Sequence, residues 1–252
     1  MNTDKSILIT GATGAIGAAL AEAYAQPGVT LHLHGRNLPM LDEVAQRCRA
    51  KGALVQRQPL DLRDFAGVRH WLTSLGALDL VIVNAGLNTH VGPAGEAEPW
   101  DEVEALVDVN LKASMLIVES VLPAMRARGA GQIALISSLA AYFGLPATPV
   151  YCASKAGLKA YGEALRGGLG PLGIRINVVM PGYVRSAMCA AMPGPKPFEW
   201  PPERAARAIR HGLARDRARI SFPFPLSWGT WWLAVLPAPI SIRLLRWLGY
   251  GR

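Results

Sequence analysis

The sequence predicts an α/β fold in which a doubly wound, parallel sheet forms the middle of three layers and helices cover both of its faces. Short apolar runs alternate with longer helical patterns as far as Met180, which is the order of repeated strand–helix–strand units. The runs are apolar at nearly every position, as is typical of strands buried on both faces. With 252 residues, of which 51% are hydrophobic, the chain is long enough for one such domain.

The first half of the chain predicts three strands and three helices. The strands are expected at residues 7–10 (ILIT), 30–34 (TLHLH) and 54–59 (LVQRQP). The helices are expected at the Ala-rich segment 15–25 and at segments 39–51 and 64–74. Because a helical segment follows each strand, neighbouring strands are expected to be parallel.

The second half continues the pattern with longer helices. Strands are expected at residues 78–84 (LDLVIVN), 132–137 (QIALIS) and 175–180 (RINVVM). Segments 100–128 and 150–169 predict long helices, and a further helix from Pro201 has Ala205, Ile209 and Leu213 on one side and arginines on the other. We therefore expect a sheet domain at 1–221, followed by an apolar, Trp- and Pro-rich extension at 222–252.

Charge and cysteine content narrow the class of protein. The net charge of +8 favours an anionic partner: a phosphorylated cofactor, an anionic membrane surface or a nucleic acid. Cys48, Cys152 and Cys189 lie far apart and form no CxxC pair, so we expect neither a disulfide framework nor a metal site. The first residues pass directly into a strand without an apolar leader, which favours a cytoplasmic protein.

A glycine-rich loop joins the first strand to the first helix. In ILITGATGAIGAAL, Gly11, Gly14 and Gly17 follow the strand and open the helix. The loop amides and the helix dipole of such a turn bind a pyrophosphate, which predicts a Rossmann-type dinucleotide site. The alternative is a strand–helix turn that binds no ligand.

The end of the second strand bears on which dinucleotide binds. NAD enzymes place an acidic residue there to hold the ribose 2′-hydroxyl, but LHLHGRN has none and offers Arg36 instead. A guanidinium gives two donors to a 2′-phosphate, so NADP(H) is favoured over NAD(H). Alternatively, Arg36 is only a solvated loop cation. His32 and His34 are expected to be structural.

Four polar residues further along suggest catalysis. Tyr151 and Lys155 in YCASK are four apart on a predicted helix and share one face. Ser138 ends the strand that contains IALIS, and Asn110 lies inside the long preceding helix. Together with TGATGAIG, Asp61, NAG at 84–86 and PGYVRS at 181–186, these residues resemble the short-chain dehydrogenase/reductase family in its shorter, single-domain branch, over residues 5–220.

The resemblance implies an oxidoreductase that interconverts a carbonyl and a secondary alcohol by hydride transfer, with Tyr151 as acid and base. Lys155 would lower the pKa of the Tyr151 phenol and hold the nicotinamide ribose. Ser138 would bind the substrate oxygen, and Asn110 would hold a water that links Lys155 to solvent. Residues expected to bind the cofactor are Gly11, Thr13, Gly14, Ala15, Ile16, Gly17, Arg36, Asp61, Leu62, Asn84, Ala85, Gly86, Tyr151, Lys155, Pro181, Gly182, Val184 and Ser186.

The glycine loop departs from the family pattern TGxxxGxG. The middle glycine is Gly14, and Ala15 occupies the position that is usually glycine. Because alanine is small, we expect the loop to tolerate it. No basic residue lies inside the loop, so the preference for NADP(H) depends on Arg36.

The segments around the expected reaction centre are apolar and favour a lipophilic substrate. The resemblance implies that the segment after residues 181–182 is a mobile lid over this substrate. Alternatively, these side chains pack among themselves. They are Leu139, Ala140, Ala141, Tyr142, Phe143 and Leu145 after Ser138, and Tyr183, Met188, Met192, Phe198 and Trp200 in the lid segment.

The extension is unusual in composition. Residues 220–242 carry no charge, and four of the seven tryptophans lie between Trp228 and Trp247. Prolines leave only 226–236 uninterrupted, which is too short for the ~20 apolar residues of a transmembrane helix. Three interpretations remain open: a helix at a membrane surface, a substrate gate or oligomer contact, and a plain helical cap.

The leading functional hypothesis is NADPH-dependent reduction of a lipophilic ketone or acyl substrate. A non-catalytic NADP(H)-sensing regulator that binds a membrane or a protein is the alternative, because fold does not fix function. No nucleic acid is expected, since no recognised motif or stacking platform accompanies the arginines. The resemblance also implies a homodimer or homotetramer through the two long helices.

Overall fold

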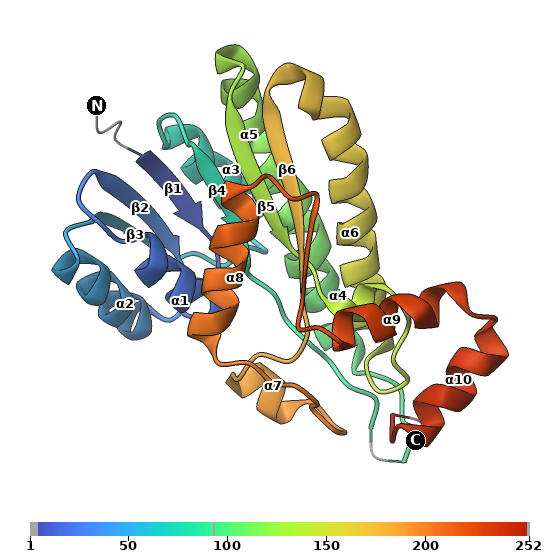
Figure 1. The fold of residues 1–252 in the computed structure, drawn as a ribbon. Coiled ribbons are helices and arrows are strands. Elements are labelled where there is room, and N and C mark those ends of the chain that lie inside the picture. The colour runs from blue at the N-terminus through green and yellow to red at the C-terminus, as the bar shows by residue number, and fades with distance from the viewer. Residues whose placement is uncertain (1–4, 93, 251–252) are drawn as a thin grey trace.

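A seven-stranded parallel sheet forms the centre of the computed structural model, which describes residues 5–92 and 94–250 (Figure 1). The first four residues of the expected domain and the last two of the extension lie outside the described residues. The strand order is β3-β2-β1-β4-β5-β6-β7. The strands are β1 (Lys5–Ile9), β2 (Val29–His34), β3 (Leu54–Gln58), β4 (Leu80–Val83), β5 (Gly131–Ile136), β6 (Ile174–Pro181) and β7 (Arg219–Phe222). The predicted doubly wound sheet is confirmed.

Helices cover both faces because successive strand residues point to opposite sides. Ile7 and Ile9 of β1 join one core with α1 (Ala15–Tyr24), α2 (Leu38–Ala50) and α8 (Pro202–Ala214). Leu8 joins the other core with α3 (Phe65–Ser74), α5 (Ser114–Arg128) and α6 (Pro149–Leu169). This alternation produces the three predicted layers.

The chain reverses its direction of winding at β1, which pairs with β2 on one side and β4 on the other. The connections on the two sides therefore leave a crevice at the carboxyl ends of these strands, where doubly wound sheets bind ligands. The glycine loop follows β1, and the NAG segment follows β4.

Two elements differ from the sequence-based expectation. Strand β7 was not predicted, because four residues between arginines and prolines give little signal; it pairs with β6 through Met180 and Ser221. The expected boundary at 221 therefore falls within a strand. The expected helix 100–128 is divided into α4 (Trp100–Val107), a π-helical segment (Asp108–Ala113) and α5.

The extension folds into two short helices, α9 (Leu226–Val235) and α10 (Ala238–Trp247). With α7 (Ala187–Ala191) they project beyond the carboxyl ends of the strands (Figure 1). Within residues 5–92 and 94–250, no helix is both long and apolar enough to cross a membrane.

Candidate active site

A cavity of about 750 Å³ opens at the carboxyl ends of the strands. It brings together nearly all of the expected site residues; only Gly17 and Asn110 do not line it. Those that do are Gly11, Thr13, Gly14, Ala15, Ile16, Arg36, Asp61, Leu62, Asn84, Ala85, Gly86, Ser138, Tyr151, Lys155, Pro181, Gly182, Val184 and Ser186.

The glycine loop packs tightly against the end of β4. Gly11 has a φ of +64°, and a Cβ atom there would lie 2.8 Å from the Cα atom of Ala85. A Cβ atom on Gly17 would lie 2.2 Å from the carbonyl oxygen of Gly11, so Gly17 is needed for close packing rather than for contact with a ligand. Ala15 is the first residue of α1 and needs no left-handed backbone, which explains why alanine is accepted there.

Side-chain amide and hydroxyl groups hold this loop in place. Asn84 Nδ2 donates to the carbonyl oxygens of Thr10 and Gly11 at 3.0 and 3.1 Å. The Thr10 hydroxyl accepts the backbone N–H groups of Asn84 and Ala85. The glycine loop and the NAG segment therefore form one rigid wall of the cavity.

His34 supports the same loop from β2, in agreement with the structural role expected for it. Its Nε2 lies 2.9 Å from the carbonyl oxygen of Leu60, so Nε2 carries the proton. Its Nδ1 then accepts the N–H of Gly11 at 3.4 Å. Burial lowers the pKa of His34, which keeps the ring neutral.

Arg36 and Asp61 line the end of the cavity beyond this loop. Arg36 is exposed, and no carboxylate pairs with it among residues 5–92 and 94–250. Both carboxylate oxygens of Asp61 bind Arg63, and this hydrogen bonding lowers the pKa of Asp61 to about 2. The guanidinium of Arg36 is thus the free cation of this region in the described structure.

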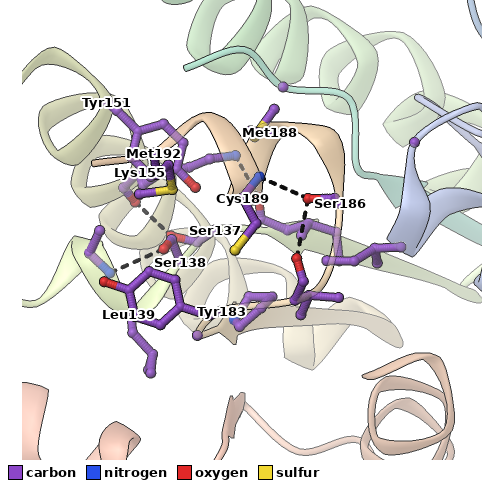
Figure 2. Close-up of a pocket in the computed structure, with 18 of the residues that line it drawn as sticks. Ser137, Ser138, Leu139, Tyr151, Lys155, Tyr183, Ser186, Met188, Cys189 and Met192 are labelled. Carbon is purple, nitrogen blue, oxygen red and sulfur yellow. Dashed lines mark hydrogen bonds between the residues drawn. The ribbon is translucent and has the colours of Figure 1, made fainter. Parts of the chain in front are cut away.

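The opposite end of the cavity holds the expected catalytic residues. Figure 2 shows Ser138, Tyr151 and Lys155 side by side on the cavity wall. Lys155 Nζ lies 5.7 Å from the centre of the Tyr151 ring and donates to the carbonyl oxygen of Ile136 at 2.9 Å. The lysine is only 4% exposed.

Burial controls the acidity of this pair. It raises the pKa of Tyr151 to about 12, although the hydrogen bond from Ser138 acts in the opposite direction. It lowers the pKa of Lys155 to about 8. Burial is the largest influence on the pKa of Tyr151, and the expectation that Lys155 lowers this pKa stays a prediction.

Asn110 lies behind the wall, in the π-helical segment. Its Oδ1 accepts the N–H of Leu87 at 2.7 Å, and its Nδ2 donates to the carbonyl oxygen of Leu87 and to Ser154 Oγ, each at 3.0 Å. π-helical turns, in which the helix carries an extra residue, are frequent near functional sites. Asn110 positions the NAG segment against α6, and the water relay stays a prediction.

The segment after β6 begins the lid. Ser186 Oγ accepts the N–H of Cys189 at 3.0 Å and so caps α7, while donating to the carbonyl oxygen of Val184 at 3.2 Å (Figure 2). The lid contributes Tyr183, Met188 and Met192 to the cavity, as expected.

Two residues of the lid segment that were expected near the substrate lie elsewhere. Phe198 is 55% exposed, and Trp200 stacks on Phe222 at a ring-centroid distance of 5.0 Å. Ala141 and Tyr142 also do not line the cavity, whereas Leu139, Ala140, Phe143 and Leu145 do.

Sequence reasoning did not identify the individual residues that α9 and α10 contribute. The extension forms an apolar wall of the cavity, which favours the gate among the three interpretations of the tail. The residues are Leu226, Gly229, Thr230 and Leu233 from α9, and Leu244, Leu245, Leu248 and Tyr250 from α10 and the turn after it. Their apolar spacing was the only signal available in the sequence.

The chemistry of this cavity fits a dinucleotide. Gly14 caps α1 without a side chain, so the first helical N–H groups remain available to a pyrophosphate. Arg36 adds a guanidinium to the lining of the same cavity, and Tyr151 and Lys155 line it as well.

A family model described as short chain dehydrogenase matches residues 5–194. An oxidoreductase from Myxococcus xanthus, whose own activity is uncharacterised, is 34% identical over 242 residues, which cover 94% of each chain.

Two solved structures share the architecture. A short-chain dehydrogenase from Sphingobium yanoikuyae in complex with NADPH superposes with a TM-score of 0.82 and 26% identity, over 95% of both chains. The bulky-bulky ketone specific alcohol dehydrogenase from Comamonas testosteroni gives a TM-score of 0.78 and 25% identity, over 88% of this chain and 87% of its own.

Proposed function

This chain belongs to the short-chain dehydrogenase/reductase family of oxidoreductases, and we propose that it uses NADPH to reduce the carbonyl group of a lipophilic ketone or acyl substrate. The observation that carries the proposal is that Ser138, Tyr151 and Lys155 line the same cavity as the glycine loop and Arg36. A hydride donor held by the loop would thus meet a proton donor on α6.

Each catalytic side chain has a distinct task in this reduction. When bound, NADPH supplies the hydride that adds to the carbonyl carbon. Ser138 Oγ holds the carbonyl oxygen, and the Tyr151 hydroxyl gives its proton to that oxygen as negative charge develops. The raised pKa of Tyr151 keeps this proton in place at neutral pH. The Lys155 ammonium stabilises the phenolate that is left.

Arg36 supports NADPH over NADH, because an exposed, unpaired guanidinium at the end of β2 suits a 2′-phosphate. The structurally similar dehydrogenase from Sphingobium yanoikuyae binds NADPH. Asp61 does not oppose this preference, since its charge is engaged by Arg63.

The apolar walls from the lid, α9 and α10 support a lipophilic substrate. The likeness to a bulky-ketone alcohol dehydrogenase agrees with this class. Polar groups on the wall are few, and the hydroxyl of Thr230 is engaged by the carbonyl oxygen of Leu226 within α9.

The test is the oxidation of NADPH and NADH, followed by absorbance, with lipophilic ketones, sugar ketones and oxoacyl thioesters. Turnover should be confined to one substrate class, and Tyr151→Phe should lower kcat about a thousandfold while still binding NADPH. Retained turnover in Tyr151→Phe would exclude its role as the acid. NADPH binding without turnover of any substrate would favour the alternative, a non-catalytic sensor.

We also propose that the extension, besides forming a wall of the cavity, attaches the enzyme to an anionic membrane surface through side chains that do not line the cavity. Among residues 220–252 the only charges are arginines, and exposed apolar side chains gather on α9, α10 and the turns beside them. Tryptophans beside arginines are typical of helices that lie in a membrane interface. The exposed residues that do not line the cavity are Phe224, Trp228, Trp231, Trp232, Val235, Ile240, Ile242 and Trp247.

We propose a homodimer or homotetramer that assembles through α5 and α6, in line with the resemblance of the sequence to its family. Light scattering after size-exclusion chromatography measures the mass in solution. A monomer at micromolar concentration would contradict the proposal.

A further inference from the structure

Two tyrosine hydroxyls connect the end of α10 to the lid. Tyr183 OH donates to Tyr250 OH at 3.2 Å, and Tyr250 OH donates to the carbonyl oxygen of Pro195 at 2.9 Å. The three residues follow β6, α10 and α7 respectively, so this short chain of hydrogen bonds joins segments that are 55 and 67 residues apart.

The backbone fixes Tyr250 relative to α10. Gly249 adopts a φ of +85°, and the N–H of Tyr250 bonds the carbonyl oxygen of Leu245. This is the pattern of a Schellman motif, which gives a helix end a defined geometry. Gly194 in the lid also has a φ of +85°, and a Cβ atom there would lie 3.8 Å from the Tyr250 ring. The Tyr250 side chain is therefore held in a fixed position relative to α10.

Both tyrosines line the cavity that holds the catalytic residues. Figure 2 shows Tyr183 on the same wall as Ser138 and Leu139. On its other side, α10 packs on α9, where the buried Ser241 Oγ donates to the carbonyl oxygen of Leu233 at 2.8 Å. The helix is thus held by α9 near its start, through Ser241, and by the tyrosine pair at its end.

We propose that Tyr183 and Tyr250 are specificity-determining residues, because their hydrogen bond holds α10 as the far wall of the substrate pocket. This rests on the proposed function of the cavity. A ketone with its oxygen at Ser138 would extend its apolar body toward Leu244 and Leu248. While the Tyr183–Tyr250 hydrogen bond is formed, α10 limits the size of the apolar body that the pocket accepts. When this bond is lost, α10 is free to move and the pocket admits a larger substrate.

The first readout needs no turnover. In Tyr250→Phe, deuterium uptake by the peptide 238–250 should be at least about fivefold faster than in the wild type, because the lost hydroxyl makes two neutral hydrogen bonds, one with Tyr183 and one with Pro195. Tyr183→Phe keeps the bond to Pro195 and should have a smaller effect. The double variant should behave as Tyr250→Phe alone, because one interaction is removed only once.

The second readout is the ratio of kcat/KM for cyclododecanone to that for cyclohexanone. It should rise about fivefold in Tyr250→Phe, with the KM for NADPH unchanged, and should stay at the wild-type value in Tyr24→Phe, a matched loss of a hydroxyl on α1. Unchanged uptake in Tyr250→Phe, or additive effects in the double variant, would overturn the proposal. Failure of the proposed function would appear instead as NADPH binding without turnover of either ketone, while the difference in deuterium uptake persists.

Discussion

Lys155 and Ile136 join the helix that carries Tyr151 to the sheet, through the 2.9 Å hydrogen bond from Lys155 Nζ to the Ile136 carbonyl oxygen. A second bond runs in the reverse direction, from Ser137 Oγ to the carbonyl oxygen of Lys155 at 2.7 Å. Both hydrogen bonds are buried, and Ile136 and Ser137 come immediately before Ser138 in the chain. The relative position of Ser138 and Tyr151 therefore depends on a lysine that carries charge in a dry environment.

The burial of this charge predicts a pH dependence of stability. The pKa of Lys155 falls from an ordinary 10.5 to about 8 on folding, so the unfolded chain binds more protons between these values. Stability then rises with pH in that window. Between pH 8 and pH 10 the free energy of unfolding of the wild type should increase by about 2 kcal/mol relative to Lys155→Met. Urea unfolding at the two pH values measures this, and parallel pH curves for the two proteins would contradict it.

Arg36 predicts the cofactor preference. Arg36→Ala should raise the KM for NADPH about tenfold to a hundredfold and leave that for NADH nearly unchanged, since only NADPH carries the 2′-phosphate. Steady-state kinetics with both cofactors measures the difference. Arg63→Ala is the matched control, because Arg63 is engaged by Asp61 and its loss should affect both cofactors alike. A similar loss for both cofactors in Arg36→Ala would remove the proposed contact.

The centre of the sheet could be predicted because its strands are strongly apolar and each is followed by a helical pattern. LDLVIVN and RINVVM give the buried strands β4 and β6, and the glycine loop gives the turn after β1. Strand β7 could not be predicted, because its four residues are stabilised by pairing with β6 rather than by their own pattern. The π-helical segment at Asn110 likewise depends on tertiary bonds to Leu87 and Ser154.

The site could be predicted where a motif keeps its residues close in sequence, as YCASK does for Tyr151 and Lys155. The contribution of α10 could not, because Tyr183 and Tyr250 meet across 67 residues and neither belongs to a repeated pattern. The burial of Tyr151 and Lys155 could not be predicted for a similar reason: spacing on a helix reveals a neighbouring charge but not the burial of both groups.

Asp216 lies just before β7, at the end of the sheet opposite the cavity, and it predicts an effect on stability. Its carboxylate accepts hydrogen bonds from Arg166 at 2.8 and 2.9 Å and from the buried Asn177 at 3.0 Å. The backbone of Asp216 has a φ of +46°, in the left-handed region. Asp216→Asn keeps a residue that tolerates this backbone but removes the charge. Denaturant unfolding at neutral pH should show a loss of about 1–2 kcal/mol, because the pair is partly exposed.

The control for this effect is the more exposed pair of Arg219 and Glu163. Arg219→Ala should cost less than about 1 kcal/mol. The pKa of Asp216 is lowered by its hydrogen bond with Arg166, so the stabilisation is present near neutral pH and is lost as the pH falls through that pKa. If the free energies of unfolding of the wild type and Asp216→Asn differ by the same amount at neutral and acidic pH, the stabilisation is not ionic.

The tryptophans of the extension predict binding to lipid vesicles. Trp228 and Trp247 are 57% and 81% exposed, and replacing both with serine should lower partitioning onto phosphatidylglycerol-containing vesicles about tenfold. Co-sedimentation measures the bound fraction. Trp100→Ser is the matched control, since Trp100 is 71% exposed but lies on α4. Added salt should weaken binding, because Arg243 and Arg246 supply the attraction to anionic lipid.

The same variants separate a membrane surface from a contact between copies of the chain. If α9 and α10 bury their tryptophans against a second copy, light scattering should show a smaller oligomer for the Trp228→Ser, Trp247→Ser protein than for the wild type. The wild type should then not bind vesicles. If they face lipid, the mass should be unchanged and only the vesicle-bound fraction should fall. An interface helix gains affinity from apolar area and from anionic lipid together, so wild-type binding that is equal on neutral and anionic vesicles would exclude the role given to the arginines.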